Sequence, residues 1–343
     1  MGRILETKAL YKETISTVTQ DEQSWQSFLD SSSWNFKYDF DDQILIYAQR
    51  PDAKACASID EWNNKLRRWV NKDTTPIMVF DKAEDRQYPF RFVFDISDTH
   101  NKQNTEYKLW SLKPEYESEI IEALESNFGE ISNKESLALA INLASYNMVE
   151  DNIEDYIETI YNNKKGTMLE DMNEHDIRVA VTATTWASVY YMIMTRCGLD
   201  PKEYLSEQDF SYVKYFNSYQ TVTGLGMAVS DIAEMELRQI ARTVFELQKN
   251  EKNKNRTIEK INKEIYDTVK NKNEGGVEND ENRVHETGGL YDAQSSDDRG
   301  EDANRQIREN EVQILEGTQE SRIDITATGK WLVAKAPPSR VRR

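Results

Sequence analysis

A run near the middle of the chain, VAVTATTWASVYYMIM at positions 179–194, most constrains what this sequence can fold into. Drawn as a helix it is apolar on nearly every side, and Gly198 with Pro201 supplies a helix end. A helix without a polar face must be enclosed by other elements. The run is shorter than the roughly 20 apolar residues that cross a bilayer, and it is rich in threonine. The sequence therefore predicts a helix over about 171–197, buried inside a helical bundle.

Helical patterns surround this segment on both sides in the sequence. They cover about 114–127, 133–148, 151–162, 206–215 and 228–250, and a capping box of Ser132 and Glu135 opens the second. Residues 251–272 can continue as an extended or fraying helix with sparse apolar positions. Residues 273–343 are rich in Gly, Asn and charge and poor in aromatic side chains, which predicts a disordered charged tail.

The first third of the chain mixes helical and strand patterns. Helices are expected over 3–18, from a Thr19/Glu22 capping box onward, from about Asp39 to Arg50, and over 59–71 behind a Ser58/Glu61 box. Residues 77–80 and 91–96 are rich in β-formers and predict an antiparallel hairpin or two adjacent strands, and residues 107–110 are a candidate third strand. The predicted fold is α+β: a small helix-plus-sheet domain over 1–112, then an acidic all-helical domain over 113–250.

Length, cysteine usage and hydropathy set further limits. The 343 residues give room for two ordinary domains, and no segment resembles a signal peptide or a membrane span, so we expect a soluble, cytoplasmic protein. Two cysteines and three histidines form no zinc-binding spacing, so we expect no metal, cofactor or disulfide framework.

The negative charge is concentrated in one part of the chain. The net charge is −18, but residues 1–113 carry 16 basic and 18 acidic side chains, while 114–250 carry 10 and 24. Phosphate binding depends on Lys and Arg, so acidity argues against a nucleic-acid partner for the middle segment. The N-terminal segment is nearly neutral and stays compatible with one.

Residues 33–80 hold aromatic and basic side chains close together in sequence. Single-stranded nucleic acid binds to such surfaces, because bases stack on aromatic rings and phosphates pair with cations. The stacking candidates are Trp34, Phe36, Tyr38 and Tyr47, and the phosphate-binding candidates are Arg50, Lys65, Arg67, Arg68 and Lys72.

The predicted helix over 59–71 separates these groups into two faces. Trp62, Leu66 and Trp69 recur at helical spacing, and so do Lys65, Arg68 and Lys72. Large aromatic residues at this spacing are more often core than ligand contacts, so Trp62 and Trp69 are expected to point inward. The cationic face could equally be an ordinary solvated surface.

Catalytic motifs are weak. Asp39, Asp41 and Asp42, or Asp95, Asp98 and His100, could hold a metal of a nuclease, but helix capping and turns explain them with fewer assumptions. Gly224 and Gly226 lack the third glycine of a dinucleotide fingerprint, and Walker A and nucleophile-elbow motifs are absent. We therefore expect no catalysis from this chain.

Several blocks in order resemble a known family. They are SWNFKYDFDDQILIYAQRPDAKACASIDEWNNKLRRWV from residue 33, then FVFDISDT, VEDNIEDYIE, RCGLDPKEYLSEQDF and AVSDIAEMELRQIARTV. Together they are similar to the N-terminal region of large helicase and DNA-methyltransferase proteins of integrative conjugative elements. That region resembles an ArdC-type antirestriction domain, which implies single-stranded DNA binding in a mobile element.

The chain departs from this family in two ways. Family members carry a basic KGxKG-like turn after the tryptophan segment, whereas residues 71–76 read NKDTTP, without glycine. Neither the HExxH of ArdC-type proteins nor a helicase or methyltransferase module is present, so the chain looks like a truncated or stand-alone head of a larger protein.

The sequence thus favours a non-catalytic module that binds single-stranded DNA, with a helicase, methyltransferase or host-defence protein as a possible partner. An alternative is that the acidic 113–250 segment binds a basic host protein by presenting phosphate-like charge. The third hypothesis, a metal-dependent nuclease, is not expected.

Overall fold

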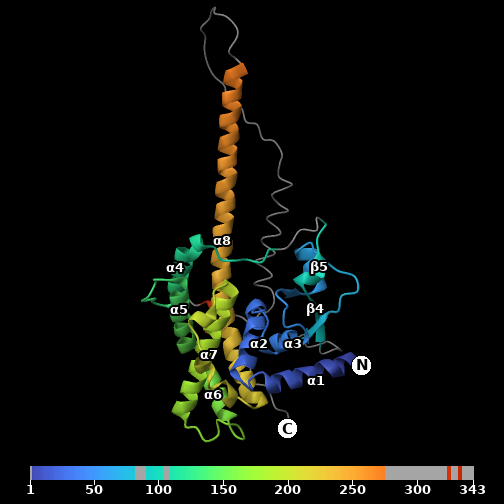
Figure 1. Cartoon of the computed structure of the whole chain (residues 1–343), viewed down its shortest axis with the longest axis vertical. Coiled ribbons are helices and arrows are strands. Elements are labelled where there is room, and N and C mark those ends of the chain that lie inside the picture. Colours follow the sequence, from blue (N-terminus) through green and yellow to red (C-terminus); the bar gives the residue numbers. More distant parts are fainter. Residues whose placement is uncertain (1, 82–89, 103–107, 275–322, 326–330, 334–343) are drawn as a thin grey trace, which may run out of the picture.

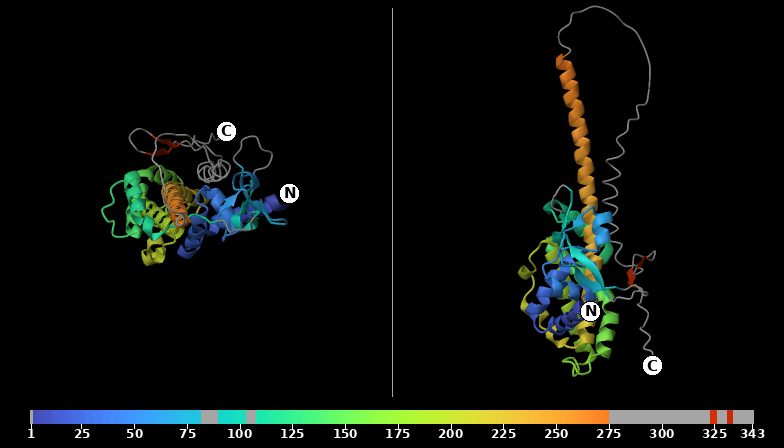
Figure 2. Two further views of the ribbon diagram at one scale, coloured as in Figure 1. Left: turned by 90° about the horizontal axis from the view of Figure 1, so that it is seen from above. Right: turned by 90° about the vertical axis from the view of Figure 1, so that its right-hand side faces the viewer.

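The computed structural model describes residues 2–81, 90–102, 108–274, 323–325 and 331–333. It is mostly helical, with small antiparallel sheets near the N-terminal end, which confirms the predicted α+β class. The sheet strands β4 and β5 lie across the body from helices α4 and α5, and one long helix, α8, extends far beyond both (Figures 1 and 2).

The predicted central helix is α7, Glu174–Cys197. The side chain of Asn173 caps its N-terminus by accepting from the Asp176 N–H, and Gly198 ends it in the left-handed conformation with φ 77°. Helices α2 (Glu22–Trp34), α5 (Leu137–Asn152) and α8 (Tyr219–Glu274) all pack against it. The prediction of a helix buried in a bundle is confirmed, since every residue from Ala187 to Met194 is buried.

The remaining helices of the second half are α4 (Glu117–Phe128), behind a 3-10 turn at Pro114–Tyr116, and α6 (Glu154–Asn162). Helix α5 starts later than predicted, because Ser136 caps it and not Ser132. The segment 206–215 forms two separate 3-10 turns, Glu207–Phe210 and Val213–Tyr215, with a further 3-10 turn at Pro201–Glu203.

The N-terminal helices follow the predicted order. They are α1 (Gly2–Thr17), α2 and α3 (Phe40–Gln49), and Asp39 caps α3 as expected. Asp21, rather than Thr19, caps α2, because the Thr19 hydroxyl instead donates to the carbonyl of Phe216, 2.6 Å away. A long-range bond has thus taken the place of the local capping box.

The predicted hairpin is confirmed as β3 (Ile77–Phe80) antiparallel to β4 (Phe90–Asp95), with Ile77 opposite Val93. A short edge strand, β1 (Cys56–Ala57), completes the order β1-β4-β3. The predicted third strand is wrong at 108–110, which has no regular structure, while Tyr107 lies outside the described residues. A separate ribbon pairs β2 (Trp69–Val70) with β5 (Thr99–His100), after a 3-10 turn at Ile96–Asp98.

The predicted helix over 59–71 is wrong beyond its first turns. The Ser58/Glu61 box forms, but the turn that follows, Glu61–Lys65, is a single turn of π-helix. The backbone then reverses at Arg67, whose φ is 51°, and enters strand β2. Pairing of Trp69 with His100, distant in sequence, outweighs local helix propensity here.

One hydrophobic core runs across the predicted boundary at residue 112. Its buried members extend from Tyr11 on α1 to Val244 on α8. Polar contacts also cross it: the Trp25 indole donates to the Ser188 hydroxyl at 2.8 Å, and the Tyr191 hydroxyl donates to Asp30 at 2.9 Å. The α+β part and the helical part are therefore packed as one body, and among the described residues a smaller second core lies behind the sheet.

Gly226 is explained by packing rather than by nucleotide binding. A methyl group at this position of α8 would lie 2.1 Å from the ring of Phe40 on α3. The glycine lets the two helices approach closely, which joins α3 to the bundle.

Helix α8 continues to Glu274, so the predicted helical continuation over 251–272 is confirmed. The prediction of disorder from 273 onward is wrong for 273–274 and for two short paired strands, β6 (Ile323–Ile325) and β7 (Trp331–Val333). The rest of that tail lies outside the described residues. Within the part of the chain that the structure describes, no helix is both long and apolar enough to cross a membrane.

We expect the buried carboxyl of Glu236 to make stability pH-dependent. Glu236 on α8 is fully buried, accepts from the Ser145 hydroxyl at 2.9 Å, and burial raises its pKa from 4.5 to about 8. Between these values the unfolded chain loses a proton that the folded chain keeps. The free energy of unfolding should therefore fall by about 1.4 kcal/mol per pH unit in that window.

Denaturant unfolding of Glu236→Gln at pH 5, 6.5 and 8 tests this. The variant should lack that component of the pH dependence and gain stability relative to the wild type as the pH rises. Glu234→Gln is the control, because Glu234 is half-buried on the same helix and already paired with Arg238. A constant difference between Glu236→Gln and the wild type at all three pH values would contradict the prediction.

Candidate nucleic-acid interface

The predicted site residues do not share one surface. Trp34, at the end of α2, is half-buried between two cations: Lys54 Nζ lies 4.9 Å and Arg196 Cζ 4.7 Å from its ring centroid. Arg196 is itself buried, stacks on Trp110 at 3.4 Å and donates twice to the Trp110 carbonyl at 3.1 Å. Burial lowers the pKa of Arg196 to about 10. Trp34 thus belongs to a cation–π cluster that joins α2 to α7.

Three further stacking candidates face the interior. Phe36 is 4% exposed and Tyr38 3% exposed, and the Tyr38 hydroxyl donates to the Cys56 carbonyl at 2.8 Å. Tyr47 is partly buried and packs edge-on against Phe28, with the ring centroids 5.8 Å apart. The stacking prediction is wrong for Phe36 and Tyr38, because rings enclosed in the core present no face to a base.

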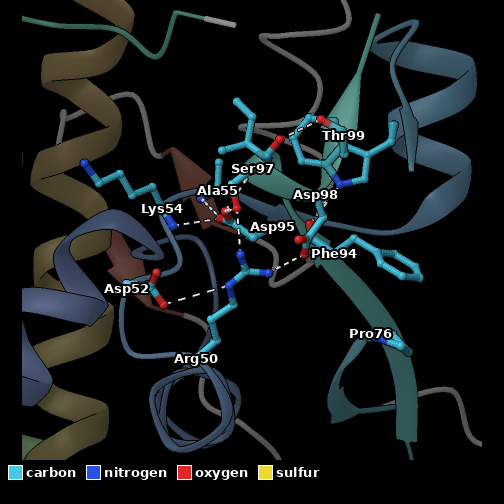
Figure 3. Close-up of polar contacts among 12 residues, drawn as sticks. Arg50, Asp52, Lys54, Ala55, Pro76, Phe94, Asp95, Ser97, Asp98 and Thr99 are labelled. Carbon is cyan, nitrogen blue, oxygen red and sulfur yellow. Dashed lines mark hydrogen bonds and ion pairs between the residues drawn. The ribbon is translucent and has the colours of Figure 1, made fainter. Parts of the chain in front are cut away.

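Arg50 is engaged in a polar network at the end of β4 (Figure 3). Its guanidinium pairs with Asp98, donates to the Ser97 hydroxyl at 2.7 Å and lies 3.8 Å from Asp52. Next to it, the buried Asp95 accepts from the backbone N–H groups of Lys54 and Ala55 at 2.7 and 2.9 Å. Arg50 therefore holds the loop after α3 against the sheet, and its charge is already balanced.

The carboxylates of the nuclease hypothesis have structural partners. Asp41 accepts from the Tyr11 hydroxyl at 2.6 Å, and the buried Asp42 accepts from the Phe80 N–H at 2.8 Å. Burial raises the pKa of Asp42 to about 6. Across the described ranges, no three His, Cys, Asp or Glu side chains are grouped so that they could hold a metal ion.

The four cations around β2 divide into one buried and three accessible side chains. Arg68 is buried, and its guanidinium donates to the Thr99 hydroxyl at 2.7 Å and the Thr99 carbonyl at 2.9 Å. The prediction that Arg68 contacts phosphate is therefore wrong. Arg67 and Lys72 are exposed and Lys65 is half-exposed, and none forms an ion pair within 4.0 Å with another described residue.

Of the two tryptophans expected to point inward, only Trp62 does so. It is buried, and its indole donates to the Phe94 carbonyl at 2.9 Å. Trp69 is only half-buried, because it lies in strand β2 opposite His100. The two rings are 6.4 Å apart at a tilt of 40°, and Lys102 Nζ lies 5.8 Å from the Trp69 ring centroid.

The β2–β5 ribbon therefore gathers an aromatic and basic surface, which we call the ribbon patch. It consists of Lys65, Arg67, Trp69, Lys72, His100 and Lys102. Sequence reasoning considered His100 only as a metal ligand, missed Lys102 and placed Trp69 in the core. The sequence offered no strand periodicity that would have grouped them, because β5 ends at His100 and Lys102 lies in the turn beyond it.

Two residues at the ends of β2 have unusual backbone conformations. Arg67 has a φ of 51° and Asp73 a φ of 64°, values that side-chain-bearing residues adopt at a cost of about 1–3 kcal/mol. Asp73 lies in the NKDTTP turn, so this turn has the left-handed geometry that glycine adopts more easily. These two left-handed residues flank strand β2 on either side in the sequence.

Comparison with known proteins yields no relative: no family model, curated protein sequence or solved structure matches this chain.

We expect Arg68 and Arg67 to differ sharply in their contribution to stability. Arg68→Gln removes a buried charged donor from Thr99 and should lower the free energy of unfolding by about 1–3 kcal/mol. Arg67→Gln changes an exposed side chain and should stay within about 0.5 kcal/mol of the wild type. Urea unfolding of both variants measures the difference, and equal losses would show that the assignment of the two arginines is wrong.

Proposed function

We propose that this chain binds single-stranded DNA through the ribbon patch, without catalysis. The observation that carries the proposal is Trp69: a large ring, partly exposed on a two-stranded ribbon and close to Lys102. A tryptophan in this position is not needed to fill the core, and its face is the right size and chemistry for a base.

The basic side chains near Trp69 are also consistent with single-stranded DNA as the ligand. Arg67 and Lys72 lie before and after β2, so a strand that stacks a base on Trp69 would pass its phosphates near both. Stacking on an aromatic residue contributes about 1–3 kcal/mol per base and tolerates any sequence. The proposed site is small, a few nucleotides long, and has no preference for sequence.

The charge distribution favours a modest and salt-sensitive affinity. The 114–250 segment carries 10 basic and 24 acidic side chains and would repel a polyanion, which confines binding to the nearly neutral N-terminal part. The DNA should therefore approach from the ribbon side of the body, away from α4 and α5 (Figure 1).

The biological setting we propose rests on the sequence blocks alone. Their resemblance to the head region of conjugative-element proteins fits a role in handling or protecting the single-stranded DNA of a mobile element. In that setting a helicase or methyltransferase would act on the same DNA.

A second candidate function is binding of a basic protein to the acidic helices. A groove of about 350 Å³ between α4 and α8 is lined by Glu119, Glu122 and Glu246. The two functions separate experimentally. Glu119→Gln with Glu122→Gln should weaken capture of a basic host DNA-binding protein while leaving oligonucleotide binding unchanged or slightly stronger.

For the leading proposal, we expect Trp69→Leu in the full chain to weaken binding of a fluorescent oligo-dT by about 5- to 150-fold. This corresponds to the loss of about 1–3 kcal/mol of stacking. Trp69→Phe keeps an aromatic face and should retain most of the affinity. Fluorescence anisotropy at low salt measures the affinity of the wild type and of both variants for the oligonucleotide.

The cations are tested through salt dependence. Arg67→Gln with Lys72→Gln should lower the slope of log affinity against log salt by about 0.7 for each lost phosphate contact. The matched control is Lys8→Gln with Lys12→Gln, which removes two exposed lysines from α1. An equal decrease of the salt slope in both double variants would refute the proposed site. So would a wild type that does not bind the oligonucleotide at low salt.

A further inference from the structure

The C-terminal part of α8 forms an exposed stem. From residue 252 to residue 264, the last of this helix whose side chains are described, every side chain is exposed, and the helix continues to Glu274. In Figure 1 and in the right-hand view of Figure 2 it projects away from the body as one straight rod. Residues 251–274 span about 36 Å at 1.5 Å per residue.

The composition of the stem does not favour a helix by itself. Asparagine occurs at 250, 253, 255, 262, 271 and 273, and it is among the weaker helix formers. The body supplies the helix nucleus through α8, but each further residue must be stabilised as the helix propagates. Packing against a partner along an apolar face is the usual source of that stability.

The stem carries such a face. Ile258 is 46% exposed and Ile261 48% exposed, which is unusual for isoleucine. Ile265 and Val269 follow at spacings of four, so all four positions fall on one side of a helix. We call these residues the stem stripe. Lys254 and Lys272 stand on the same side by spacing and limit its length.

We propose that the stem stripe pairs with the stem stripe of a second copy of this chain in an antiparallel coiled coil. Self-pairing suits the positions that border the stripe, because Asn255, Thr257 and Asn262 carry no charge and would not repel their own copies. Charged residues such as Arg256 and Lys263 lie on the opposite side of the helix, where they keep contact with water.

The charges specify the antiparallel direction. Residues 249–262 carry five basic and two acidic side chains, whereas 263–274 carry three of each. A parallel pair would align the two cationic halves and bring the two acidic bodies to the same end. An antiparallel pair places each cationic half beside a neutral one and separates the bodies by the length of the stem.

The short stripe implies a weak dimer. The four apolar positions span fewer than the three to four heptads over which a stable coiled coil usually extends. The self-association should therefore depend on concentration in the micromolar range and leave the fold of the body unchanged.

The test is sedimentation of the full chain over a range of concentrations, with Ile258→Gln and Ile261→Gln combined. Glutamine is a good helix former, so the stem should persist while the stripe is lost. We expect the wild type to dimerise and this variant to stay monomeric with at least a tenfold weaker association. Arg256→Gln with Lys263→Gln on the opposite side is the matched control and should dimerise like the wild type.

Small-angle scattering of the wild-type dimer tests the direction. An antiparallel pair gives an elongated particle with a body at each end, whereas bodies side by side would overturn the antiparallel arrangement. A wild type that stays monomeric at high concentration, or a dimer that survives loss of both isoleucines, would overturn the proposal as a whole.

Discussion

Burial of α7 is the constraint on which the rest of the structure depends. Because its centre has no polar side, elements from distant parts of the chain must cover it, and α2, α5 and α8 do so. The polar atoms on its surface then need partners inside the core. Ser188 and Tyr191 find theirs in Trp25 and Asp30 of α2. The N-terminal part is thereby fixed to the helical part by hydrogen bonds as well as by apolar contact.

The same constraint determines which aromatic side chains remain accessible to a ligand. Arg196 at the end of α7 draws Trp34 and Trp110 into one cation–π cluster, and α3 draws Tyr47 toward the core. Most aromatic residues of the N-terminal part are consequently used for packing. The β2–β5 ribbon lies at the edge of this body, where Trp69 keeps part of its surface accessible.

Neighbouring residues with the same chemistry have opposite roles in this ribbon. Arg68 turns inward to Thr99 and contributes to the fold, whereas Arg67, with its left-handed backbone, stays exposed. Composition alone could not have distinguished them, since a basic cluster has the same appearance in sequence whichever side chains are buried. The stem of α8 is the reverse case, because its apolar spacing is visible in sequence and only its exposure required the structure.

The sequence by itself determined those elements whose cause is local. Periodicity and end signals predicted α7 and α3, and β-forming runs predicted the β3–β4 hairpin, because the residues that cap or pattern these elements lie within them. Only the tertiary structure decided the region around Trp69. There, pairing of residues 69–70 with 99–100 replaced a locally favoured helix, and the energy of that choice comes from contacts across about 30 residues of chain.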